Sequence, residues 1–413
     1  MTISTKSWIR ITIINLFVVA SLGVLMRYKI GFEFPFFDQK NIQHAHSHFA
    51  FSAWVSLALM VLITNFFQES ISQVRHKTYR ILFLVSLSVS YLMMLSFAIS
   101  GYSILSIVLS TLGVFISFVF ARWAFSDLNK APVHASKNWF KAAVLLSVLS
   151  SIGTFALAYM MASKSITLNN YLSAVYWYLH FQYNGWFFFA FMGLFIAYLK
   201  RIIPQYVIDR RVFLLMIFSI IPTYGLSVLW IHLPVWVYII VVLGTIAQSI
   251  AWILFIQNVF KSRLFHSSIC HPLAKFLFAL VLISFTIKLS LQLASVIPAV
   301  SKLAFGYRPI VIAYLHLVLL ACFSIFIVAY AFANRFIQES RASTMGILIF
   351  VVGVFLNELV LGIQGIASFT YVIVPHVNVY LFSVSIIILI GVITLLCAQF
   401  VPRERIEKEA VSL

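Results

Sequence analysis

Apolar residues in this chain form long uninterrupted runs rather than the alternating pattern of a half-buried strand. Each run is close to the roughly 20 residues that a helix needs to cross a lipid bilayer. Runs this long and continuous exclude the strands of a membrane β-barrel. The pattern therefore predicts an all-α, polytopic integral membrane helix bundle with about twelve transmembrane helices. We expect spans near residues 8–27, 44–66, 79–100, 103–125, 139–162, 172–199, 211–231, 236–259, 272–297, 308–333, 344–367 and 376–400.

Composition supports the same class. The chain is 63% hydrophobic and only 9% charged, more apolar surface than a soluble domain can bury. The segments between the runs are short, so we expect a single transmembrane domain over residues 1–413 that ends in a short cytoplasmic tail at 401–413. Walker, GxGxxG and HExxH motifs do not occur in the sequence. Function is therefore expected inside the bundle or at its outer loops.

The net charge of +18 leaves the predicted fold class unchanged, but the distribution of the basic residues predicts the membrane topology. Lys and Arg are spread singly through short loops, which does not favour a nucleic-acid surface. They concentrate at the N-terminus, in the loops after even-numbered runs and in the tail, so both termini are predicted to be cytoplasmic. No small-residue cleavage site follows the first run, which is expected to stay as a span. The isolated Cys270, Cys322 and Cys397 predict neither disulfides nor a zinc site.

Histidines carry the candidate chemistry. His44, His46 and His48 lie at the predicted outer end of the second run. His180 and His316 lie about eight residues into the sixth and tenth runs, roughly 12 Å below the same surface. Imidazoles are costly in lipid and are good ligands of haem iron and copper. We therefore expect a buried metal or haem centre, although surface histidines can be solvated and buried ones can bond to a neighbouring helix.

Helical spacing divides the triplet. Residues four apart share a helix face, whereas residues two apart point about 200° from one another. If the helix includes the triplet, His44 and His48 face one way and His46 faces another. One turn could then serve two neighbouring centres, or one centre and a supporting partner.

The stretch His44-Ala45-His46-Ser47-His48-Phe49 resembles the His-x-His signatures of the haem–copper oxidase subunit I superfamily. It is also similar to the His-Ala-His stretch of the NnrS family of membrane haem–copper proteins. The resemblance implies that His46 or His48 pairs across a haem with His316. It further implies that His180, followed by Tyr183 and Asn184, takes the place of a copper ligand.

The chain departs from the oxidase pattern at two places. The tenth run has only His316, and the seventh has no histidine before His232 at its outer end. The copper site therefore looks incomplete, whereas one bis-histidine haem fits the pattern. The resemblance implies a protein of the bacterial inner (plasma) membrane with an electron donor or other respiratory subunits as partners. It also implies a small gas ligand, NO or O₂.

Two further ionisable residues, Lys288 and Glu358, lie deep in predicted spans, where an unpaired charge is costly. We expect them to pair with each other, while a proton path remains an alternative for both. Lys288 could instead bind a haem propionate, which makes it a candidate cofactor-binding residue. Gln292 and Gln364 could extend a polar lining on the same spans.

Three functional hypotheses follow. The first is a haem-binding or haem–copper membrane protein of oxidoreductase type that transfers electrons or handles a diatomic gas. The second is a transporter or channel without a cofactor, with Lys288, Glu358, Asn357 and Gln292 along its path. The third is a non-catalytic haem sensor or assembly protein. No catalytic residue is assigned in any of them.

Overall fold

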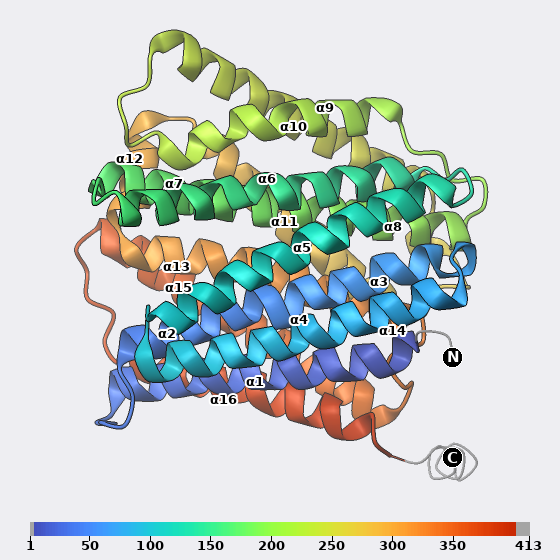
Figure 1. Cartoon of the computed structure of the whole chain (residues 1–413), viewed down its shortest axis with the longest axis horizontal. Helices are drawn as coiled ribbons and strands as arrows, with labels where there is room; N and C mark the ends of the chain where they lie inside the picture. The colour runs from blue at the N-terminus through green and yellow to red at the C-terminus, as the bar shows by residue number, and fades with distance from the viewer. Residues whose placement is uncertain (1–3, 402–413) are drawn as a thin grey trace. The chain divides into compact units, whose positions relative to one another are not determined.

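The computed structural model describes residues 4–401, and helices are its only regular elements (Figure 1). The predicted tail lies outside the described residues beyond Val401. The elements are α1 (Thr5–Gly31), α2 (Gln39–Phe49), η1 (Ala50–Ser56), α3 (Leu57–Phe67), η2 (Gln68–Ser70), α4 (Gln73–Ser100), α5 (Ile104–Lys130), α6 (Ser136–Ala162), α7 (Leu168–His180), η3 (Phe181–Phe187), α8 (Phe188–Ile202), α9 (Arg210–Thr223), η4 (Tyr224–Val228), α10 (Val235–Lys261), η5 (Leu264–His266), α11 (Pro272–Ala294), α12 (Pro298–Gly306), α13 (Arg308–His316), η6 (Leu317–Ser324), α14 (Ile325–Ala333), α15 (Arg341–Phe369) and α16 (Val377–Ala398).

The predicted spans are confirmed. Eleven helices in the described residues are long and apolar enough to cross a membrane, and a bent pair adds a twelfth. That pair joins Arg210–Ser219 to Pro222–Val228 at an angle of 44°. Pro222 has no N–H to give to the preceding turn, so a bend is expected there. The short helix α12, between two spans, was not predicted.

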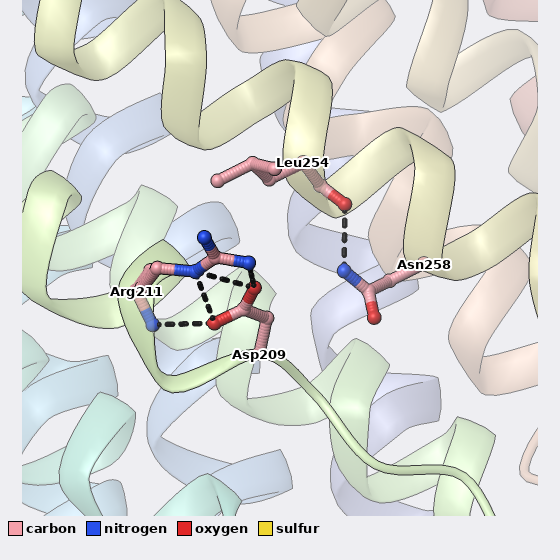
Figure 2. Close-up of polar contacts among 4 residues, drawn as sticks. All are labelled: Asp209, Arg211, Leu254 and Asn258. Carbon is pink, nitrogen blue, oxygen red and sulfur yellow. Dashed lines mark hydrogen bonds and ion pairs between the residues drawn. The ribbon is translucent and has the colours of Figure 1, made fainter.

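Polar side chains fix where several helices begin. Asp38 accepts hydrogen bonds from the main-chain N–H groups of Lys40 and Asn41, which starts α2 five residues before the predicted limit of the span. Asp209 caps α9 in the same way and also accepts bonds from the Arg211 side chain (Figure 2). Ser72, Thr167 and Ser340 cap α4, α7 and α15.

The chain forms two compact units, each made of separate segments. Unit 1 comprises Met1–Asn65, Ser72–Ile116 and Ser324–Leu413, and unit 2 comprises Phe66–Ile71 and Ser117–Phe323. Cys270, Cys322 and Cys397 form no disulfide among the described residues. The expectation of one transmembrane domain and the orientation of the termini stay predictions.

Close helix contacts in unit 1 depend on glycine. Helix α15 packs along α16, and α16 packs on α1 (Figure 1). A Cβ at Gly346 would lie 2.5 Å from the Leu395 main-chain nitrogen, and one at Gly391 would overlap the Phe350 nitrogen. Small residues let two backbones approach this closely in a membrane, where apolar side chains gain little from leaving lipid.

Unit 2 is packed by aromatic rings. Phe188, Phe191 and Phe285 form a cluster in which the last two rings stack with centroids 4.5 Å apart. Helix α6 lies against α7 and α8, where Gly193 leaves room for the Phe140 ring. The buried aromatic side chains of the C-terminal half of Leu168–Ile202 therefore serve bundle packing.

Three segments depart from α-helical geometry in the same way. The π-helices η1, η3 and η6 begin two residues after His48, one residue after His180 and one residue after His316. A π-helix is rare, and such segments are frequent at functional sites because they re-aim side chains and strain the hydrogen-bond ladder. Every π-helix of residues 4–401 thus follows a histidine of the candidate set.

Candidate functional site

His46 faces α1 within unit 1. Its Nδ1 lies 3.1 Å from the main-chain oxygen of Val19, and its ring lies beside Gly23, where a Cβ would be 3.5 Å from Cε1. A carbonyl oxygen can only accept, so Nδ1 carries the hydrogen and Nε2 carries the lone pair. The His46 ring is half-buried.

His44 and His48 face the other way, toward the end of α4. The His48 ring stacks on Phe97 with centroids 4.3 Å apart and planes 16° apart. The His44 ring meets Tyr102 edge-on with centroids 4.6 Å apart, and His48 Nε2 lies 3.5 Å from the Tyr102 hydroxyl. The predicted division of the triplet, with His46 on a different face, is confirmed.

His316, in unit 2, ends α13. Its Nδ1 lies 2.8 Å from the Ile312 oxygen one turn earlier, which again places the hydrogen on Nδ1 and the lone pair on Nε2. Side chains of residues 309–317 are half-buried, whereas those of residues 321–332 are buried. The N-terminal part of the span Arg308–Ala333 is therefore packed less tightly than its C-terminal part.

His180 belongs to a buried polar chain in unit 2. Its Nε2 donates to the Ile220 oxygen over 2.8 Å, and its Nδ1 accepts from Asn184 Nδ2 over 3.1 Å. The Asn184 amide oxygen then accepts a hydrogen bond from Lys288 Nζ. All three side chains are at most 2% exposed. The Ile220 carbonyl can only accept and the Lys288 ammonium can only donate. These two ends therefore fix the tautomer of His180 and the orientation of the Asn184 amide between them.

The Ile220 oxygen is available because the helix changes type there. Tyr224 N–H bonds to Ile221 rather than to Ile220, as α9 gives way to the 3₁₀ turn η4. Ile220 consequently accepts from His180 and from the Thr223 hydroxyl. A main-chain acceptor of this kind leaves no trace in the sequence beyond Pro222, which marks the bend.

Lys288 has a partner other than the expected one. Besides Asn184, its ammonium lies 5.8 Å from the centroid of the Phe188 ring. Glu358, in unit 1, accepts from its neighbour Asn357 over 3.2 Å. A Lys288–Glu358 pair would join the two units, and it stays a prediction. The Asn184 bond nevertheless gives Lys288 the compensation that burial requires.

The structure thus gathers the candidates into three groups: His46 with α1, His44 and His48 with Tyr102, and His180 with Asn184 and Lys288. In residues 4–401, no three His, Cys, Asp or Glu side chains are arranged to hold a metal ion. Sequence analysis missed Tyr102. Its only signal was its position after Gly101, whose φ of 57° ends α4.

Comparison with known proteins adds no assignment. No protein-family model matches the chain, and no curated protein matches it either. The resemblance to haem–copper oxidases and to the NnrS family remains a prediction from the sequence.

Proposed function

We propose that this protein is a haem-binding integral membrane protein that transfers electrons or handles a diatomic gas, with His46 and His316 as the axial ligands. One observation carries the proposal. Each of these imidazoles has its Nδ1 within hydrogen-bond distance of a main-chain carbonyl, which makes Nδ1 the donor and orients the ring. A ligating histidine almost always has such a partner, which fixes its tautomer and raises the basicity of the ligand.

The same criterion separates the two pairings that the sequence left open. His48 makes no such bond to a carbonyl from its ring, and its Nε2 instead faces the Tyr102 hydroxyl. His46 is therefore the better axial ligand of the second span. The π-helix that follows His316 adds support, because π-helical segments are common at sites that bind cofactors.

The resemblance seen in the sequence, together with the two ring orientations, leads us to propose a bis-histidine haem. When bound, the haem would supply a one-electron Fe(III)/Fe(II) couple. The protein would hold the two imidazoles in one tautomer and exclude water with its apolar helices, which together set the reduction potential. We include an electron donor or respiratory partner subunits in the proposal, together with location in a bacterial plasma membrane.

Copper is outside this proposal. Both ring nitrogens of His180 already have protein partners, Ile220 and Asn184. A copper ion at His180 would have to displace one of these buried bonds. The residues around His180 therefore do not fit a copper ligand set as they stand, and we derive no reaction step through copper.

The test is an absorption spectrum of the purified protein carrying an affinity tag without histidine. We expect a sharp Soret band and the spectrum of a six-coordinate low-spin haem. His46→Ala and His316→Ala should each remove most of the haem or convert it to a high-spin form. His232→Gln, outside the proposed ligands, is the matched control and should leave the spectrum unchanged.

A colourless, folded protein from haem-replete cells would overturn the proposal and favour a transporter without a cofactor. Buried polar atoms in unit 2 give that rival its support. Gln248 Oε1 and Gln292 Oε1 hydrogen-bond to no described residue, and Gln292 lies one turn from Lys288. The protein could instead show the expected low-spin haem spectrum but consume no O₂ or NO in the presence of a reductant. That result would replace the enzyme hypothesis with the hypothesis of a haem sensor or an assembly protein.

A further inference from the structure

We propose that His44, His48 and Tyr102 form a binding site for a divalent transition-metal ion of the Zn²⁺ or Cu²⁺ kind. The site lies in unit 1, at the predicted outer end of the span Gln39–Ser70. It uses neither His46 nor His316 and does not depend on the proposed haem.

The two imidazoles have the spacing of a chelating pair. His44 and His48 are four residues apart on α2, so their side chains lie one above the other on one helix face. Two histidines at this spacing bind zinc in metalloprotease helices. Both rings lie against Phe97, at centroid distances of 5.9 and 4.3 Å, which confirms the shared face.

Tyr102 brings an oxygen to the pair. It follows Gly101 in the turn between α4 and α5, and its ring contacts His44, His48 and Phe97 with centroid distances of 4.6, 6.3 and 5.1 Å. The positive φ of Gly101 makes this turn possible, and Asn41 of α2 packs against Gly101. The turn is thereby held against the helix that carries the histidines.

The separation of the donor atoms is compatible with metal binding. His48 Nε2 and the Tyr102 hydroxyl are 3.5 Å apart, longer than the about 2.7–3.2 Å of an effective bond. Two ligands about 2.0–2.1 Å from one tetrahedral ion lie roughly 3.3–3.4 Å from each other. The observed separation is within a small side-chain adjustment of that value.

The site is also accessible and preorganised. His44 and His48 are half-buried, Tyr102 is 54% exposed, and the His44 ring nitrogens hydrogen-bond to no residue among 4–401. The stacked Phe97 holds the His48 ring in place. Two nitrogens and one phenol oxygen would leave a fourth position for water, the arrangement of an open zinc or copper site.

Binding would release a proton from the Tyr102 phenol, because the phenolate is the ligand form. The Cu²⁺ complex should therefore show phenolate-to-copper charge-transfer absorption and nitrogen hyperfine splitting in its electron paramagnetic resonance spectrum. These two features report the ligands directly, without any measurement of activity.

The experiment is a Zn²⁺ titration by calorimetry, followed by Cu²⁺ spectroscopy, on detergent-purified full-length protein with a histidine-free tag. We expect one site. His44→Gln and His48→Gln should each weaken it by about tenfold or more. Tyr102→Phe should weaken binding and remove the charge-transfer band while nitrogen hyperfine splitting remains. A variant is compared with the wild type only if its melting temperature and its gel-filtration elution volume match those of the wild type.

Two controls make the result specific. His232→Gln and His376→Gln change other histidines at the predicted outer side and should leave the affinity unchanged. Absence of Zn²⁺ binding by the folded protein would overturn the proposal, as would equal weakening in the control variants. His46→Ala should lose haem but keep the Zn²⁺ site, so failure of the haem proposal and failure of this one are distinguishable.

Discussion

The indole Nε1 of Trp54 donates a hydrogen bond of 2.8 Å to the hydroxyl of Ser324, a residue 270 positions later in the chain. Trp54 lies within the π-helix η1, and Ser324 is the last residue of the π-helix η6. Both side chains are at most 2% exposed and belong to unit 1. Within unit 1, the bond therefore ties η1 to Ser324, the residue at which its C-terminal segment begins.

Ser324→Ala should destabilise the protein by about 1–2 kcal/mol, because the buried Trp54 N–H would lose its acceptor. Thermal unfolding in detergent measures the loss. The double variant Ser324→Ala with Trp54→Phe removes both partners and should recover part of the stability relative to Ser324→Ala alone. A single variant as stable as the wild type would mean that the bond contributes nothing.

The number of spans was readable from the sequence because length and apolarity alone decide whether a helix can cross a bilayer. The π-helices were not, because the residue types in η1, η3 and η6 share no pattern that distinguishes them from α-helix. Their geometry depends on tertiary bonds such as the 2.7 Å bond from Asn15 Nδ2 to the Ala53 oxygen within η1. The sequence gives no direct sign of a partner 38 residues away.

Part of the candidate site could be predicted from the sequence, namely the part that depends on local helix geometry. Helical spacing alone separated His46 from His44 and His48, and that division is confirmed. The partner of Lys288 is Asn184, 104 residues distant, and their proximity is a result of tertiary structure that the sequence does not show. Sequence analysis noted Asn184 beside His180 but could not connect it to Lys288.

Asn184→Leu should be strongly destabilising, by about 2–3 kcal/mol, because it leaves the buried Lys288 ammonium without its acceptor. Lys288→Met keeps the volume and removes the charge, so it should cost less. The double variant should be more stable than Asn184→Leu alone. Melting temperatures of the four proteins form a double-mutant cycle, and simple additivity would contradict a direct interaction.

Gly391→Ala should destabilise the protein by about 1–3 kcal/mol, because the new methyl group would meet the main chain of α15 at Phe350. Backbone cannot move aside as a flexible side chain can. Gly362→Ala on α15 is the matched control, since a Cβ there meets nothing within 4 Å. That control should be neutral or up to about 1 kcal/mol stabilising, through helix propensity. Equal effects of both changes would exclude close packing as the cause.

Asp209 provides a pH-dependent contribution to stability outside the membrane spans. Hydrogen bonds from the Arg211 side chain, and then from its main-chain N–H, hold the pKa of Asp209 below its ordinary value (Figure 2). A depressed pKa means that the folded state favours the carboxylate. Its contribution is therefore complete above the unfolded value of about 3.9 and is lost as the pH falls through the folded value.

Asp209→Asn keeps an oxygen that can cap α9 and removes the charge, so it isolates this ionic contribution. We expect the melting temperature of the wild type to exceed that of the variant at pH 7. The effect should be small, because the pair with Arg211 is exposed to solvent. The difference should shrink as the pH falls below about 4. Because other titrating groups cancel between the two proteins, a difference independent of pH would show that the carboxylate acts only as a neutral cap.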